Sequence, residues 1–84
     1  MKSIAVTVTT SPTLIVAADN QPRICYLHST SGSSYLGDSA VTVSSGLHLP
    51  NNTTMTIQVP LGETLYGITN TGTTNIRVLT PDVD

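Results

Sequence analysis

Residues 35–80 decide the fold and read YLGDSAVTVSSGLHLPNNTTMTIQVPLGETLYGITNTGTTNIRVLT. Short runs rich in β-branched residues alternate there with glycine, proline and asparagine, which favour turns. This punctuation predicts a β-meander, in which each strand pairs with the next one along the chain. No window of the sequence shows the apolar spacing of an amphipathic helix.

Individual strands follow from the spacing of apolar residues. Alternation predicts strands over residues 3–9, 23–29 and 54–59, and two shorter strands are predicted at 35–36 and 40–43. Residues 23–29 carry apolar side chains on both faces, which indicates a central strand. Residues 13–17 are continuously apolar, so they predict either a strand covered on both faces or the partner of the first strand.

The last predicted pair of strands covers residues 64–69 and 74–80. The intervening Asn70-Thr71-Gly72-Thr73 has the length and composition of a β-hairpin loop with Gly or Asn in the left-handed region. Gly67, inside a strand, indicates a β-bulge or a close backbone approach. Together, six to eight short strands predict one all-β domain over residues 1–84, a small antiparallel β-sandwich or barrel with no helix of note.

The composition favours a domain that gains stability from partners. The chain has 84 residues, and a domain of this size buries only about 60–65% of the surface that its unfolded chain exposes. Phe and Trp are absent, so the core must be built from many small aliphatic side chains. Small domains of this kind often oligomerise.

Charge and cysteine content argue against several kinds of partner. The net charge is -2, and the cations Lys2, Arg23 and Arg77 are far apart, so we expect neither nucleic acid nor a membrane surface as partner. Polar residues interrupt the N-terminal apolar stretch, which argues against a secretory signal. Cys25 is the only cysteine, which excludes an internal disulfide and predicts assembly in a reducing compartment.

Catalytic residue types are present without a catalytic pattern. His28 and His48 with Asp19 or Asp38 could contribute to a Ser-His-Asp site, but serine is abundant and no Gly-x-Ser-x-Gly motif occurs. The simpler interpretation places His28 on a strand face and His48 in a surface loop. The five carboxylates lie in predicted turns or in the tail, where solvated acids are common: Asp19, Asp38, Glu63, Asp82 and Asp84. We expect no enzyme.

No metal or cofactor site is predicted from the residues of one chain. Cys25 and His28 are three residues apart, which places them on opposite faces of a strand, and Cys25 is expected to be a small buried apolar residue. Three copies of one histidine on a threefold axis could still hold an ion. Tyr35 and Tyr66 could stack on a sugar ring, or could be half-buried interface residues with the hydroxyl in water.

The sequence resembles a known family in four blocks that occur in order. Residues 13–19 read TLIVAAD and precede the strand at 23–28; residues 35–50 read YLGDSAVTVSSGLHLP; LYGI at 65–68 and IRVL at 76–79 close the chain. In these blocks the chain resembles the small all-β head decoration, or minor capsid, proteins of tailed bacteriophages. The resemblance covers nearly the whole chain.

The resemblance implies a non-enzymatic virion structural protein. Such a protein decorates and stabilises, or cements, the outer surface of a capsid after assembly in the host cytoplasm, and its partners are further copies of itself, as a homotrimer, and the major capsid protein. Contact residues are expected at Tyr35, Leu36 and Tyr66. Two alternatives stay open: a tail or fibre-associated receptor-binding knob, and a carbohydrate-binding module.

Overall fold

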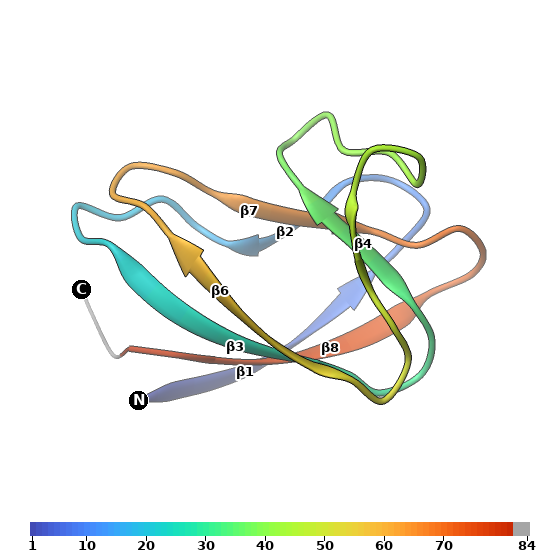
Figure 1. Cartoon of the computed structure of the whole chain (residues 1–84), viewed down its shortest axis with the longest axis horizontal. Helices are drawn as coiled ribbons and strands as arrows, with labels where there is room; N and C mark the ends of the chain where they lie inside the picture. Colours follow the sequence, from blue (N-terminus) through green and yellow to red (C-terminus); the bar gives the residue numbers. More distant parts are fainter. Residues whose placement is uncertain (82–84) are drawn as a thin grey trace.

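The computed structural model describes residues 1–81, which form eight strands and no helix (Figure 1). The strands are β1 (Lys2–Val8), β2 (Thr13–Val16), β3 (Arg23–Ser29), β4 (Ser34–Gly37), β5 (Leu47–Leu49), β6 (Thr54–Val59), β7 (Leu65–Ile68) and β8 (Thr74–Thr80). Sheet A has the order β1-β8-β3-β6, and sheet B has the order β2-β7-β4-β5. All pairs are antiparallel, so the predicted antiparallel β-sandwich is confirmed. Residues 1–81 offer no helix that could cross a membrane.

The central position predicted for residues 23–29 is confirmed. β3 pairs with β6 on one side and with β8 on the other. Its odd-numbered residues, such as Cys25 and Leu27, point to the core, and its even-numbered residues, such as Tyr26, point away from it. β6 shows the predicted alternation as well, with Val59 buried and Thr56 exposed.

The connections between strands differ from the predicted meander. Six of the seven connections pass from one sheet to the other, and only β4 and β5 are both consecutive and paired. The two sheets of a sandwich lie about 10 Å apart, a gap that a few residues can span. The predicted meander is therefore wrong: the turn residues are present, but most of them carry the chain between layers.

The predicted hairpin at residues 64–80 is also wrong. β7 belongs to sheet B and β8 to sheet A, so the loop between them joins the two layers. Thr69 and Thr74 at its ends are buried, and the Thr74 hydroxyl bonds to the Thr69 hydroxyl at 3.2 Å. The Thr69 N–H donates to the carbonyl of Thr9, which draws this residue away from β8. Gly72 does have a positive φ of 62°, as predicted for this loop.

Residues 40–43 form no strand, contrary to prediction. The Asp38 side chain accepts a hydrogen bond from the Ala40 N–H at 3.0 Å, and the Asp38 carbonyl accepts one from the Val41 N–H at 3.0 Å. The Ser45 hydroxyl accepts a bond from the Thr42 N–H at 3.1 Å. Short polar side chains thus satisfy backbone groups locally and compete with strand pairing.

Neither interpretation of residues 13–17 holds. β2 is an edge strand of sheet B that pairs with β7 rather than with β1. Leu14 points outward and is exposed, while Ile15 and Val16 are buried. The register shifts at Ile15, opposite Leu65 and Tyr66, so the irregularity lies on β2 and not at Gly67, which pairs with Thr13. Gly67 is approached closely by a side chain rather than by backbone, because a Cβ on Gly67 would lie 2.7 Å from Cδ1 of Ile15.

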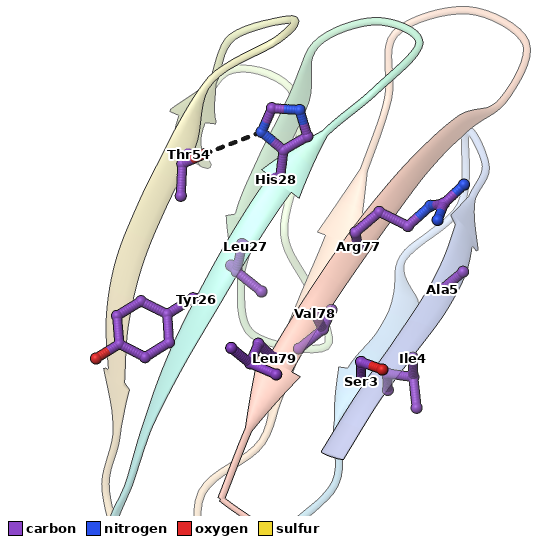
Figure 2. A pocket seen from close by; sticks show the side chains of 10 residues that line it. All are labelled: Ser3, Ile4, Ala5, Tyr26, Leu27, His28, Thr54, Arg77, Val78 and Leu79. Carbon is purple, nitrogen blue, oxygen red and sulfur yellow. Dashed lines mark hydrogen bonds between the residues drawn. The ribbon is translucent and has the colours of Figure 1, made fainter. Parts of the chain in front are cut away.

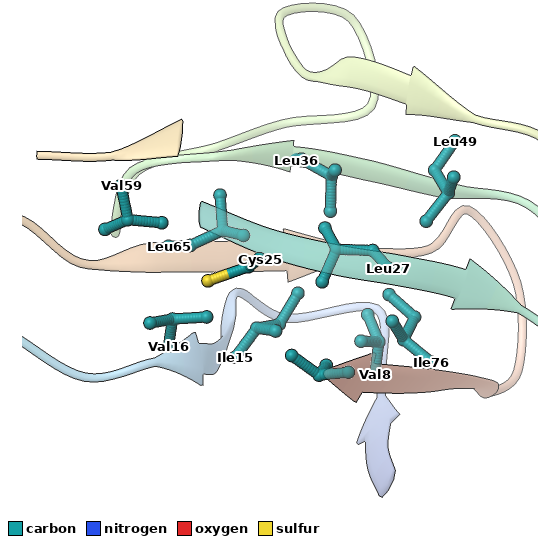
Figure 3. Packing of buried hydrophobic residues seen from close by; sticks show 11 residues of the cluster. Val8, Ile15, Val16, Cys25, Leu27, Leu36, Leu49, Val59, Leu65 and Ile76 are labelled. Atoms are coloured by element: carbon teal, nitrogen blue, oxygen red, sulfur yellow. The ribbon is translucent and has the colours of Figure 1, made fainter. Parts of the chain in front are cut away.

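The core fills the space between the two sheets (Figure 3). It consists of the buried residues Val8, Ile15, Val16, Cys25, Leu27, Leu36, Leu49, Val59, Leu65, Ile76 and Val78. Each fully buried aliphatic side chain contributes about 1.5–3 kcal/mol. Since none of these residues is aromatic, stability depends on close packing of many small groups.

The core is incomplete at the edges of sheet A. Val6 on β1 and both Met55 and Ile57 on β6 are only partly buried against it. Ile4 shares the inward side of β1 with Val8 but is 37% exposed. The predicted buried face of the first strand is therefore buried fully only at Val8, because the four-residue β2 is too short to cover the rest.

Candidate functional site

The outward side of sheet A is an uncovered surface with an apolar centre. We call this surface the open face; it consists of Ser3, Ala5 and Thr7 of β1, Asn75, Arg77 and Leu79 of β8, Ile24, Tyr26 and His28 of β3, and Thr54, Thr56 and Gln58 of β6. Ile24, Tyr26 and Leu79 are 49%, 43% and 39% exposed. Large apolar side chains on the two central strands of a sheet are normally covered, so their exposure makes this face a candidate contact surface.

The register of the strands places the large side chains in two rows. Tyr26 lies opposite Leu79, and His28 lies opposite Arg77, across the β3–β8 pair (Figure 2). At both edges of the sheet the row of Tyr26 and Leu79 ends in a small residue: Ser3 lies opposite Leu79, and Thr56 lies opposite Tyr26. One row is apolar and the neighbouring row is basic and polar.

A hydrogen bond fixes the histidine of the polar row. Nδ1 of His28 lies 2.9 Å from Oγ1 of Thr54 on β6 (Figure 2). Arg77, on the other side of His28, extends its guanidinium over the edge where Ala5 lies. The row presents hydrogen-bond donors and positive charge beside the apolar row of Tyr26 and Leu79.

The two rows border a shallow groove of about 370 Å³. Its walls come from β1, β3, β6 and β8, so all four strands of sheet A contribute. An apolar side chain could lie between Tyr26 and Leu79, and an acceptor group could meet Arg77. This arrangement suits binding of another surface. Within residues 1–81, no group of three or more His, Cys, Asp and Glu side chains could hold a metal ion.

The contact residues predicted from the sequence lie on sheet B. Tyr35 and Tyr66 are half-buried and point outward from β4 and β7, on the face turned away from sheet A. Tyr66 lies opposite Gly37, two residues from Tyr35, so the two tyrosines are diagonal neighbours. Leu36 is 3% exposed and packs in the core, so its side chain is not available to a partner and its prediction as a surface contact is wrong.

His48 lies on a strand rather than in the predicted surface loop. It belongs to β5 and pairs with Tyr35 of β4. The two rings stack with centroids 4.9 Å apart and planes inclined by 14°. His28 lies on the predicted strand face.

The loop of residues 38–46 covers part of the outward side of sheet B. Val41 in this loop is buried although it lies outside the core between the sheets. A Cβ on Gly37 would lie 2.8 Å from Cγ2 of Val41, and a Cβ on Gly46 would lie 2.6 Å from Cβ of Tyr35. Glycine at both positions thus lets the loop pack directly on β4. Sheet B is therefore partly covered on its outward side, while the open face of sheet A has no cover among the described residues.

Arg23 and Cys25 are buried at one end of the sandwich and serve its structure. Arg23 is 5% exposed and donates to three backbone carbonyls, those of Gln21 at 3.1 Å, Glu63 at 3.2 Å and Ala17. Burial raises the pKa of the Cys25 thiol, and the nearby Arg23 charge lowers it by a smaller amount. Cys25 is a buried apolar residue, as predicted. Asp82 and Asp84, predicted to be tail acids, lie outside the described residues.

Ile24, Tyr26 and Leu79 were not predicted from the sequence as surface residues. The signal was present, because both faces of the strand at 23–29 are apolar. That pattern indicates a strand covered on two sides, and sheet B covers only one. Comparison of the chain with protein-family models, with curated proteins and with solved structures finds no match. The fold and the open face define the class of protein: a small antiparallel β-sandwich with one open apolar sheet face.

Proposed function

We propose that the chain is a non-enzymatic virion structural protein that decorates and stabilises the outer surface of a tailed-phage capsid. It acts as a homotrimer, and its partners are its own copies and the major capsid protein. Assembly takes place in the host cytoplasm. The sequence blocks that resemble phage head decoration proteins support the capsid role.

One structural observation carries the self-association part of the proposal. Ile24, Tyr26 and Leu79 are exposed at the centre of sheet A. An 84-residue chain with a core free of large aromatic side chains has little stability to spare. Burying this apolar surface against further copies removes an exposed apolar patch and adds the stabilisation that the single chain lacks.

The outward side of sheet B is the surface left for the shell. Tyr35 and Tyr66 stand there side by side, and tyrosine is a frequent interface residue because its ring is apolar while its hydroxyl can stay hydrated. Contacts repeated over many copies and linked within a trimer add up, so a modest area per copy suffices for tight attachment.

Binding to capsids that lack the decoration protein tests the proposal. Purified protein is mixed with expanded empty capsids, and the bound fraction is measured after co-sedimentation. We expect saturable binding, weakened roughly tenfold or more in a Tyr66→Ala variant. Thr71→Ala, in the exposed β7–β8 loop, is the matched control and should bind normally. Protein that stays in the supernatant at all concentrations would refute the capsid role.

Labelling of intact particles separates the head from the tail. Gold-labelled antibody over the whole shell supports decoration. Label confined to the tail would instead establish the alternative, a tail or fibre-associated receptor-binding knob.

A carbohydrate-binding module is the second candidate function. The observation in its favour is the diagonal pair Tyr35 and Tyr66 on one outward face, with Tyr35 stacked on His48. Aromatic rings of this kind can stack on a sugar. A glycan-array signal that disappears in Tyr66→Ala would support this function, and a blank array with the native protein would exclude it.

A further inference from the structure

We propose that three copies join edge to edge, β1 of one copy pairing with β6 of the next, so that the three A sheets close into a twelve-stranded ring lined by the open face. The inference rests on the homotrimer of the proposed function and specifies how its subunits meet. In this assembly, the two free edges and the open face of sheet A have one kind of partner, a second copy of this chain.

Both edge strands of sheet A, β1 and β6, have one side free for pairing. In the described part of the chain, β1 pairs only with β8, and β6 only with β3. Ile4 and Val6 of β1 line an open groove of about 310 Å³ beside β2. Met55 and Ile57 of β6 are likewise only partly buried. A pairing of β1 with itself would cover the first pair and leave the second exposed, whereas β1 with β6 covers both.

Unprotected edges are unusual in a soluble sheet. Natural edge strands carry bulges, prolines or inward-pointing charges, which prevent pairing with other chains. β1 carries only one of these features, the charge of Lys2 at its first residue, and its register with β8 is unbroken over seven pairs. In sheet B, by contrast, β2 is bulged at Ile15 and β5 has only three residues. The edges of sheet A are thus built for pairing.

Strand direction permits a ring built from β1–β6 contacts. The four strands of sheet A alternate in direction, so β1 and β6 run in opposite directions. Rotation about an axis along the strands preserves strand direction. β6 of one copy therefore meets β1 of the next in antiparallel orientation, as all other pairs in the molecule do. The contact is heterologous, and such contacts form a ring when the rotation closes.

The side chains of the two edges fit one register. When the apolar inward residues face each other, Ile4 meets Ile57 and Val6 meets Met55 of the next copy. The outward residues then follow, with Ala5 opposite Thr56. Lys2 comes to the end of β6 that leads into the turn carrying Glu63, so opposite charges meet across the junction.

The ring also explains the composition of the open face. Twelve strands enclose a space roughly 20 Å across, too narrow to hold three B sheets, each about 10 Å from its A sheet. The open face must then line the interior. Its small residues Ser3 and Ala5 lie at the junctions, and the large Tyr26 and Leu79 lie at the centre of each sheet. The His28–Arg77 row lies toward one mouth, where water enters.

Intermolecular disulfides test the pairing directly. In one chain, β1 and β6 are separated by two other strands, about 14 Å, which is too far for a disulfide. The double variant Ala5→Cys/Thr56→Cys is oxidised and run on a denaturing gel without reductant, beside each single variant. Native Cys25 is buried and present in all of them. We expect covalent trimers from the double variant and monomers from both single variants.

Several results would overturn the ring. A covalent dimer from Ala5→Cys alone would show that β1 pairs with β1. An uncrosslinked double variant that sediments as a trimer would place the subunit contact elsewhere. If the native protein is monomeric yet binds capsids, the ring is wrong and the capsid role stands. If the crosslinked trimer forms but binds no capsid, the ring stands and the capsid role is wrong.

Hydrogen exchange provides a second measurement without any substitution. In the native protein at concentrations where it is oligomeric, the ring predicts that amides of β1 and β6 are protected as strongly as those of the central strands β3 and β8. Exchange of the edge amides hundreds of times faster than the central ones would contradict it, since free edges leave alternate amides open to water.

Discussion

The hydroxyl of Thr74 donates to the hydroxyl of Thr69 at 3.2 Å where β7 of sheet B passes to β8 of sheet A. The Thr69 hydroxyl in turn donates to the carbonyl of Ser33 at 3.0 Å. Both threonines are buried, so this short chain of bonds ties the two sheets together at one end. It lies where a sequence typical of a local hairpin instead connects the two layers.

Thr69→Val is expected to destabilise the protein more than Thr74→Val. Loss of the Thr69 hydroxyl leaves both the Thr74 hydroxyl and the Ser33 carbonyl without this partner, at a cost of about 1–3 kcal/mol. Loss of the Thr74 hydroxyl leaves the bond to Ser33 intact. Urea unfolding of both variants measures the difference, with the exposed Thr73→Val as control. Equal losses at positions 69 and 74 would contradict the proposed chain of bonds.

Gly67→Ala is expected to cost about 1–2 kcal/mol through crowding. The added Cβ would lie 2.7 Å from Cδ1 of Ile15, the far end of a flexible side chain, so part of the strain can relax. Ile15→Val removes that methyl group. In a double-mutant cycle, the loss caused by Gly67→Ala should therefore shrink in the Ile15→Val background. An unchanged loss would show that the backbone, not Ile15, excludes the methyl group.

The alternation of residues 23–29 and 54–59 was enough to predict two strands of an all-β fold and, at 54–59, the side that faces the core. It could not predict the partners, because a period of two defines the faces of a strand and says nothing about its neighbours. Residues 70–73 suit a hairpin loop as well as a connection between the two sheets. The structure has the connection, in which Thr69 and Thr74 are buried and Thr69 bonds to the distant Thr9 and Ser33. In the same way, Tyr26 was visibly apolar, but only the topology shows that nothing in residues 1–81 covers it.

Arg23→Met is expected to lower the free energy of unfolding by about 2–3 kcal/mol, because three carbonyls at the end of the sandwich lose a charged donor. Arg23→Lys should recover only part of this loss, since an ammonium group lacks the planar fork that reaches all three. Gln21→Ala is the control, because Arg23 bonds to the carbonyl of Gln21 and not to its side chain. A lysine variant as stable as the native protein would show that the positive charge alone matters.

Cys25 predicts a loss of stability at alkaline pH. Burial raises the pKa of its thiol above the 9.0 of a free thiol, so the folded protein favours the protonated form. The stability due to this shift is fully present below pH 9 and is lost as the pH rises toward the folded-state pKa, because the unfolded chain gives up its proton first. Tyrosine and lysine titrate in the same range. The measurement is therefore the difference between native protein and Cys25→Ala in urea unfolding from pH 7 to 10.5, a difference that should change only above pH 9. A constant difference would mean that the thiol titrates equally in the folded and unfolded protein. Fast reaction of native Cys25 with a thiol reagent at pH 8 would contradict its burial.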